Sequence, residues 1–345
     1  MTSFWKIAAP VTGVAVICGA ALLLPVYKEK ALERNPAEAA RVYRVRAERG
    51  DAQAQYRLGD SCALGKGVPQ DYTEAVRWYR KAADQGYALA QYDLGVMYYQ
   101  GQGVLQHYAE ALGWFRKAAE KGLAPAQKGL AFMYDNGVGA PQDWVEAVRW
   151  YRKAAEQGDA VAESSLGFRY AHAHGVPQDY AESVRWYRKA AKQGNAKAQY
   201  ALGDLYRQGQ GVKEDDAEAV GWYRKAAEQG DAEAQCSLGA RYELGKGVSQ
   251  NYGEAIRWLR KSADQGYSGA QCGLGDSYSK GYGVTQDNAE AVRWYRKAAE
   301  QGHPLGQYGL GFMYYHGRGV PQDYVQAHMW MSLAASGASG DIKEY

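Results

Sequence analysis

The side chains that could carry chemistry are few in this sequence and widely spaced. Its four cysteines form no CxxC pair and no close pairing, which disfavours both a zinc site and a disulfide framework: Cys18, Cys62, Cys236 and Cys272. Two histidines, His172 and His174, stand together in the segment AHAHG. No other cysteine or histidine is close to them in sequence, so variation within a turn explains the pair better than a metal site.

The glycine-rich segments are equally unpromising as phosphate loops. Gly65, Lys66 and Gly67 lack both the preceding strand and the Lys-Ser/Thr ending of a phosphate-binding loop. No nucleophile elbow, HExxH motif or isolated pair of catalytic carboxylates is present. The sequence therefore predicts no catalytic, cofactor-binding or metal-binding residues, and a protein that is not an enzyme.

A third candidate is the segment AVRWYRKAAEQG, which spans residues 147–158 and returns unchanged at 291–302. Its aromatic and basic side chains could stack on bases and neutralise phosphates, or they could belong to a packed helix. At about 100° per residue, the apolar side chains fall on one side of a helix and the charged ones on the other. Helical packing with a solvated charged face is the better explanation, and the bulk composition agrees. The 345 residues carry a net charge of only +3, and 46% are hydrophobic, which disfavours a strongly basic nucleic-acid binder and global disorder.

The chain is built from an internal repeat. Glycines that close AAEQG-like phrases recur every 36 residues, and tryptophan occupies one repeat position eight times. Eight units follow, at 51–86, 87–122, 123–158, 159–194, 195–230, 231–266, 267–302 and 303–337. Residues 31–50 form a linker and a capping half-repeat, and residues 338–345 a tail. Each unit is predicted to be a helix, a glycine-rich turn and a second helix. Asp71 and Glu74 resemble a capping box at the start of one second helix.

The consensus A-x-A-Q-Y-x-L-G, followed by G-x-G-V-x-Q-D-Y-x-E-A-V-x-W-Y-x-K-A-A-x-Q-G, resembles the Sel-1-like repeat family, which is related to tetratricopeptide repeats. The resemblance covers residues 51–337 and implies an all-α, right-handed α/α superhelical solenoid that serves as an adaptor for protein complexes. Three departures bear on local geometry: Ala131 and Ala173 replace glycines, and Cys62 replaces a tyrosine. The chain lacks the paired cysteines of the family's disulfide-rich secreted members.

Comparison of the units with one another separates scaffold from variable surface. In the first helix of each unit, the nearly constant positions cover one face, while the varying positions fall on the opposite face. The resemblance places this helix along the concave groove. Packing against a neighbouring unit is the alternative role of the varying side chains. The predicted partner-binding residues are Leu89, Val96, Met97, Phe132, Met133, Val161, Phe168, Arg169, Asp204, Arg241, Phe312 and Met313.

The N-terminal segment differs from the rest of the chain. Residues 7–26 form an uncharged run that is long enough to span a bilayer as a helix, flanked by Trp5 and Tyr27. Residues 1–30 are therefore predicted to be a transmembrane anchor, with a cleaved signal peptide or a buried helix as alternatives. The positive-inside rule does not settle the orientation. A single-pass membrane protein with an extracytoplasmic repeat domain, or a secreted protein after cleavage, is expected.

The function predicted from these features is a membrane-tethered scaffold that binds a partner protein or peptide in the groove of the solenoid. No cofactor, metal or nucleic acid is expected. An envelope or cell-wall-associated enzyme and a helical-repeat nucleic-acid binder are the alternatives. The latter would need basic residues on the varying face, which is instead mixed and partly apolar.

Overall fold

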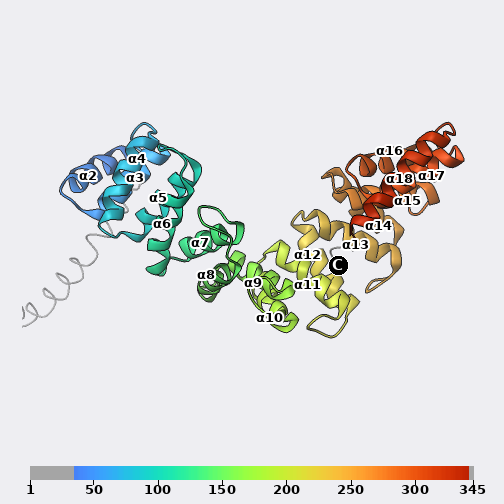
Figure 1. Ribbon diagram of the computed structural model, residues 1–345, viewed down its shortest axis with the longest axis horizontal. Helices are drawn as coiled ribbons and strands as arrows, with labels where there is room; N and C mark the ends of the chain where they lie inside the picture. The colour runs from blue at the N-terminus through green and yellow to red at the C-terminus, as the bar shows by residue number, and fades with distance from the viewer. Residues whose placement is uncertain (1–34, 342–345) are drawn as a thin grey trace, which may run out of the picture. The chain divides into compact units, whose positions relative to one another are not determined.

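The computed structural model describes residues 35–341, and this range contains seventeen α-helices, α2 to α18, and no strand (Figure 1). The predicted capping half-repeat is α2 (Pro36–Glu48). The first helices of the repeats, called leading helices below, are α3 (Ala52–Leu64), α5 (Ala88–Gln100), α7 (Ala124–Asn136), α9 (Ala160–His172), α11 (Ala196–Gln208), α13 (Ala232–Leu244), α15 (Ser268–Lys280) and α17 (Pro304–His316). The second helices, called trailing helices, are α4 (Tyr72–Asp84), α6 (Tyr108–Glu120), α8 (Trp144–Glu156), α10 (Tyr180–Lys192), α12 (Asp216–Glu228), α14 (Tyr252–Asp264), α16 (Asn288–Glu300) and α18 (Tyr324–Asp341). The predicted all-α repeat architecture is confirmed; the hand of the superhelix stays a prediction.

The chain divides into two compact units, residues 1–157 and 158–345. Among the described residues, the N-terminal unit contains α2 to α8 and the C-terminal unit α9 to α18. One leucine of each leading helix is fully buried in both units: Leu58, Leu94, Leu130, Leu166, Leu202, Leu238, Leu274 and Leu310. Each unit therefore has a core that is built from the same repeat positions.

The trailing helices begin at side-chain caps, as predicted. The Asp71 carboxylate accepts a hydrogen bond from the backbone N–H of Glu74 at 2.9 Å. The reciprocal half of the predicted capping box is absent, because the N–H of Asp71 already donates to the carbonyl of Cys62. The Glu74 carboxylate instead accepts from the indole N–H of Trp78 at 2.8 Å and pairs with Arg77. This glutamate thus fixes a tryptophan of the core.

The tryptophans of the trailing helices pack inward, which confirms their predicted role. Six are buried, and Trp222 and Trp330 are half-buried. In each of the first seven repeats a lysine three residues later lies over the indole, with Nζ 3.9–4.5 Å from the ring centroid. These lysines therefore shield aromatic rings, and are not only a solvated face.

The two helices of a repeat approach closely at a glycine. A Cβ on Gly203 would lie 2.7 Å from ring carbons of Tyr223 on the facing helix. Each leading helix also ends in a left-handed residue, which is Ala173 at φ 58° in the fourth repeat and glycine in the other seven. Ala173 thus keeps the turn geometry, although a left-handed alanine costs about 1 kcal/mol.

A buried glutamine ties successive repeats together. Gln91 Nε2 donates to the carbonyl of Ala83 at 3.0 Å, and Gln235 Nε2 donates to that of Ala227 at 3.0 Å. In the fourth repeat this position holds Glu163, which accepts a hydrogen bond from Gln193 at 2.7 Å. Burial raises the pKa of this carboxyl. The glutamine is nearly constant because it donates a hydrogen bond to a backbone carbonyl in the last turn of the preceding helix, where no N–H of that helix is available.

The chain ends differ from the regular repeats. Helix α18 continues to Asp341, past Gly337, where the sequence analysis ended the last repeat. The predicted membrane anchor, residues 1–30, lies outside the described residues. Among the helices that are described, none is both long and apolar enough to cross a membrane.

Candidate protein-binding surface

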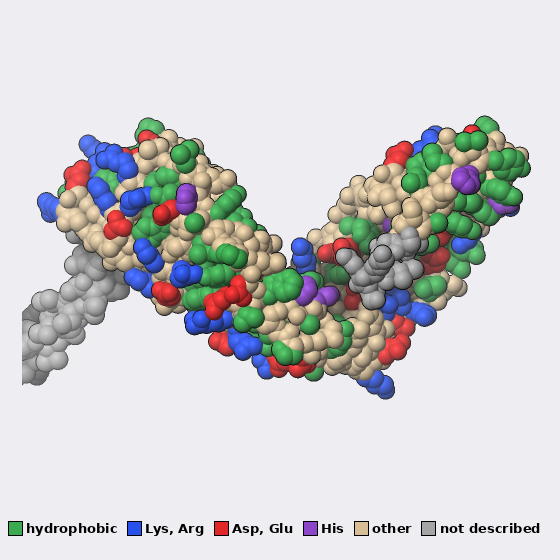
Figure 2. Space-filling model, viewed as in Figure 1, with side chains coloured by type: hydrophobic (Ala, Val, Ile, Leu, Met, Phe, Trp, Pro, Cys, Tyr) green, Lys and Arg blue, Asp and Glu red, His purple; other side chains and the backbone are tan. Residues whose placement is uncertain are grey.

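A stripe of variable residues runs along the leading helices at repeat positions 3, 7, 10 and 14, counted from Asp51 as position 1. Positions 3 and 14 are almost all exposed, whereas positions 7 and 10 are mostly half-buried. Four of the six predicted apolar contact residues on the stripe are exposed, with exposed fractions of 39% at Leu89, 44% at Phe132, 51% at Val161 and 40% at Phe168. Figure 2 shows hydrophobic side chains among charged ones on the visible face of both units. The predicted variable face is therefore exposed at these positions.

The prediction is wrong for the three methionines. Met97, Met133 and Met313 are buried, with exposed fractions of 7%, 0% and 0%. They occupy repeat position 11. This position continues the buried stripe of a small residue seven residues earlier (alanine, or Gly306 before Met313) and a leucine three residues earlier. These methionines are core side chains and offer no surface to a partner.

In the N-terminal unit the apolar residues lie on α5 and α7. Leu89 and Phe132 are exposed, and Val96 is half-buried. On the preceding leading helix, Asp60 accepts a hydrogen bond from the Tyr79 hydroxyl at 2.8 Å. Position 10 of the stripe in this unit therefore changes from an aspartate on α3 to apolar side chains on α5 and α7.

Two acidic side chains of the stripe interact in this unit, Asp60 on α3 and Asp93 on α5. Burial, together with the charge of Asp60, raises the pKa of Asp93 to about 6. Burial also raises the pKa of Tyr56 and of Tyr79, so both hydroxyls stay protonated and act as hydrogen-bond donors to these carboxylates. Among the described residues, these two aspartates belong to no group of three or more His, Cys, Asp or Glu side chains that could hold a metal ion.

In the C-terminal unit, Phe168 is the centre of an aromatic cluster at the end of α9. The ring of His172 stacks on Phe168 with centroids 4.1 Å apart, and the ring of His174 meets it edge-on at 5.7 Å. The guanidinium of Arg169, which is half-buried, lies 5.3 Å from the same ring and 3.2 Å from His174 Nδ1. The two histidines thus pack on an aromatic ring, and the described residues include no group of three metal-ligating side chains.

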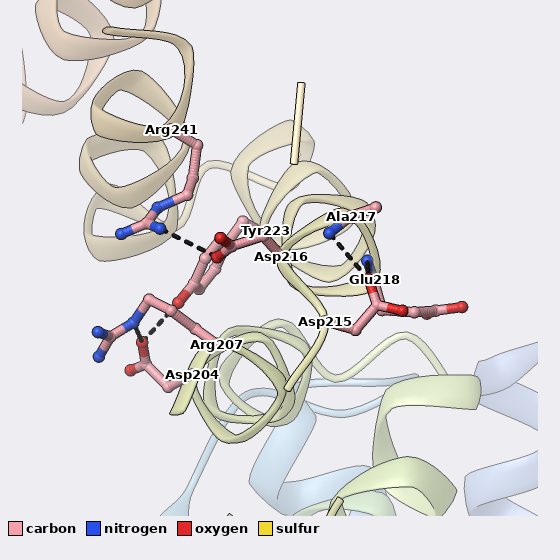
Figure 3. A network of polar contacts seen from close by, with 8 residues as sticks. All are labelled: Asp204, Arg207, Asp215, Asp216, Ala217, Glu218, Tyr223 and Arg241. Atoms are coloured by element: carbon pink, nitrogen blue, oxygen red, sulfur yellow. Dashed lines mark hydrogen bonds and ion pairs between the residues drawn. The ribbon is translucent and has the colours of Figure 1, made fainter. Parts of the chain in front are cut away.

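The predicted polar contacts of this unit are bound within the chain (Figure 3). The hydroxyl of the fully buried Tyr223 donates to Asp204 at 2.6 Å, and Arg207 pairs with the same carboxylate at 3.3 Å. Arg241 reaches Asp216 on α12 at 3.1 Å, and its side chain is only 13% exposed. Asp204 and Arg241 therefore hold helices together rather than present free charges to a partner.

The last predicted residue, Phe312 on α17, is half-buried, with the ring of His316 4.3 Å away. Leu305, at position 3 of the stripe, is 66% exposed, and Tyr308, which lies outside the stripe on the same helix, is 54% exposed. The C-terminal unit thus has apolar exposed residues on α9 and α17.

The three cysteines of the described residues are free thiols that are buried or half-buried. Burial raises the pKa of Cys236 to about 11 and that of Cys272 to about 12, and Cys62 is buried with a raised pKa as well. A thiol with such a pKa is almost wholly protonated at neutral pH.

Paired helices that repeat in sequence and expose a variable stripe on the leading helix define a tetratricopeptide-like α/α solenoid. The Sel1 repeat model matches eight segments, 52–87, 88–123, 124–159, 160–195, 196–231, 232–267, 268–303 and 304–339. The chain belongs to the Sel1 repeat family. Sel1 repeats are typical of protein–protein interaction scaffolds, and these proteins are generally not enzymes.

Two solved structures illustrate the relationship. The chain is 42% identical to c5321, a protective antigen of uropathogenic Escherichia coli strains with an SLR fold, at a TM-score of 0.79. That match covers 86% of this chain and 64% of the E. coli chain, so this chain spans just under two thirds of its relative. A Sel1 repeat protein from Oxalobacter formigenes is 35% identical, with a TM-score of 0.67 and coverage of 88% and 89%. No curated protein matches the sequence.

Proposed function

We propose that this protein is a scaffold that binds partner proteins through the exposed apolar side chains of its leading helices. The observation that supports the proposal best is the exchange at repeat position 10. Asp60, Asp204 and Asp276 occupy it in three repeats, and each accepts a hydrogen bond from a tyrosine of its own repeat. Phe132 and Phe168 replace this aspartate and leave their rings 44% and 40% exposed. Exposed aromatic rings at such positions are typical of partner contacts.

Replacement of Phe168 by aspartate tests the proposal in the C-terminal unit, and Phe132→Asp tests it in the N-terminal unit. Three natural repeats carry aspartate at this position, so both variants are expected to keep their helical content. Crosslinking in cells, affinity capture and mass spectrometry should show loss of partners that wild type retains. Unchanged partners in both variants contradict the proposal, and loss of helicity would mean that the rings belong to the core.

The scaffold is further proposed to be tethered to a membrane by residues 7–26, with its repeats outside the cytoplasm. The support is the length and uncharged character of this run. A tether raises the local concentration of the scaffold and turns weak contacts into stable assembly. Deletion of residues 1–30 should release the protein from the membrane fraction. A deleted chain that still sediments with membranes contradicts the tether.

The nucleic-acid alternative gains no support from the stripe. A nucleic-acid groove needs basic residues on the face that contacts the strand. The stripe of the described residues is instead mixed: exposed apolar side chains and the aspartates of position 10 accompany the scattered bases Arg57, Lys197 and Lys280. Steep salt-dependent binding of RNA would revive that alternative.

A further inference from the structure

One trailing helix carries a charge pattern that the others lack. On α10, Arg185, Arg188, Lys189 and Lys192 follow one another at helical spacings of three, one and three residues, and the helix has a single acid, Glu182. Repeats one to seven have an acid at the position of Lys192 in every case but this one: Asp84, Glu120, Glu156, Glu228, Asp264 and Glu300. The basic face of α10 is therefore not neutralised by an acid in its last turn.

The matched comparison is α16 in the same C-terminal unit. It has the same bases at the first three positions, Arg293, Arg296 and Lys297, but ends in Glu300. An acid four residues after an arginine forms a favourable pair on a helix surface. Lys192 removes that pair and adds a fourth cation, which makes α10 the trailing helix with the largest excess of bases in the described residues.

A hollow lies against this basic face. It encloses about 330 Å³ and is lined by the four cations, by Ala181 and Val184 of α10, and by Gly211 and Val212 of the following turn. Gly211 brings that turn close, since a Cβ there would lie 2.3 Å from the carbonyl oxygen of Tyr180. The hollow thus combines a cationic rim with aliphatic side chains.

Three of the four cations are held in place by the protein. Arg185 forms an ion pair with Glu182 at 3.2 Å. The guanidinium of Arg188 donates a hydrogen bond to the Tyr206 hydroxyl at 2.8 Å. The Lys189 ammonium lies 4.2 Å from the centroid of the Trp186 ring. The neighbouring acid on α9 is Glu163; burial raises its pKa, and the charge of Lys189 acts against that rise. Lys192 is exposed. Side chains that are already ordered lose little entropy on binding, so the site is largely prepared for an anionic partner.

The local extent of the charge identifies the kind of anion. A nucleic-acid strand would need a basic stripe that continues onto the next trailing helix. That helix, α12, has three acids, Asp216, Glu218 and Glu228, against two bases. The cationic run from Arg185 to Lys192 spans about 10 Å of helix, which three or four residues of an extended peptide cover. The aliphatic lining gives a free inorganic anion nothing to contact.

From these observations we infer that the α10 face binds a short acidic segment of a partner protein. Its carboxylates meet the four cations, and an interleaved aliphatic side chain enters the hollow beside Val184 and Val212. This surface lies on a trailing helix and is separate from the exposed stripe of the leading helices. It gives the scaffold a second contact, which is selected by charge.

The substitution Lys192→Glu tests this directly, because it gives α10 the acid that the other repeats carry and so preserves the fold. Binding of the fluorescein-labelled peptide EELEELEE is followed by fluorescence anisotropy at low salt on the full chain. Lys192→Glu is expected to weaken binding about tenfold. Lys246→Glu, the same charge change on an exposed turn of the same unit, is expected to change the affinity by less than about twofold. Circular dichroism verifies that both variants are folded.

The peptides QQLQQLQQ and EEGEEGEE separate the two parts of the site. The first should not bind, and the second should bind more weakly than EELEELEE because it lacks aliphatic side chains. Equal loss of affinity in Lys192→Glu and Lys246→Glu, or equal binding of the uncharged peptide, overturns the inference. Tight binding of inorganic pyrophosphate that displaces EELEELEE also overturns it, because the site would then take small anions. None of these outcomes bears on the leading-helix proposal, whose residues lie elsewhere.

Discussion

The close approach of helices at Gly203 leads to a prediction that opposes helix propensity. Alanine is the better helix former by about 1 kcal/mol, so Gly203→Ala in α11 would be expected to stabilise an isolated helix. In the folded repeat the new Cβ would lie 2.7 Å from two ring carbons of Tyr223 and 3.2 Å from the carbonyl oxygen of Ala219. We expect the variant to be less stable than wild type.

The magnitude follows from how little the ring can move. Carbon atoms pack at about 3.5–4.0 Å, so the ring would have to retreat by about 1 Å. Tyr223 is fully buried, and its hydroxyl is held by Asp204 at 2.6 Å. Overpacking of this kind costs about 1–3 kcal/mol, and the upper end applies because the ring is fixed at both ends. Subtraction of the gain in propensity leaves a net loss of about 2 kcal/mol.

Gly221 on α12 of the same repeat provides the matched control. A Cβ there would meet no atom within 4 Å, so Gly221→Ala should gain about 1 kcal/mol from propensity alone. Urea unfolding followed by circular dichroism gives the midpoints of wild type and both variants. Because a repeat array can unfold in more than one step, hydrogen exchange of α11 and α12 verifies that the loss is local.

The two variants should shift the midpoint in opposite directions. If Gly203→Ala raises the midpoint as much as Gly221→Ala does, the helices are not in the described contact and the packing argument is refuted. A reduced midpoint with normal protection of α11 and α12 would place the strain elsewhere.

Two further predictions concern the N-terminal unit. Trp78→Ala should destabilise the protein by about 3–5 kcal/mol, because it removes a buried indole from the core; an unchanged thermal midpoint would contradict the packing role. The raised pKa of Asp93, about 6 in the folded chain against about 3.9 unfolded, means that the folded state binds more protons between these values. Stability from this group should therefore fall as pH rises through about 6. Asp93→Asn should remove that dependence and raise the urea midpoint at neutral pH, and an unchanged slope with pH would show that another group is responsible.

The sequence was sufficient for the helical hairpins and their packed faces. Spacing of 36 residues, terminal glycines and the tryptophan position are local features that every repeat shows, and the structure confirms them. It was insufficient for the boundary between exposed and buried positions. Met133 and Phe132 are adjacent in sequence, yet the first is fully buried and the second 44% exposed. Both positions vary among the repeats, and variation among repeats does not distinguish a surface position from a core position at which packing tolerates different side chains.

Ion pairs between residues far apart in the chain also could not be predicted from the sequence. Arg241 and Asp216 are separated by 25 residues, and no local pattern indicates that they meet. The basic surface of α10 was different, because Lys192 interrupts a column of acids that is visible in the sequence alone. The hollow beside it could not be predicted, because it is completed by Gly211 and Val212 of the following turn, which only the fold brings against α10.

The aspartate–tyrosine hydrogen bonds within repeats have a consequence for folding fidelity. Near-identical trailing helices, such as α8 and α16, give a folding chain many wrong partners of almost equal apolar shape. Mispairing of α3 with α6 would place Asp60 opposite Phe115, which has no hydroxyl to replace that of Tyr79. A half-buried carboxylate without its donor costs about 1–3 kcal/mol. Such polar pairs therefore discriminate against the trailing helices that lack this tyrosine, α6, α14 and α18, where Phe115, Leu259 and Met331 stand in its place. They do not exclude α8, α10, α12 or α16, which carry it.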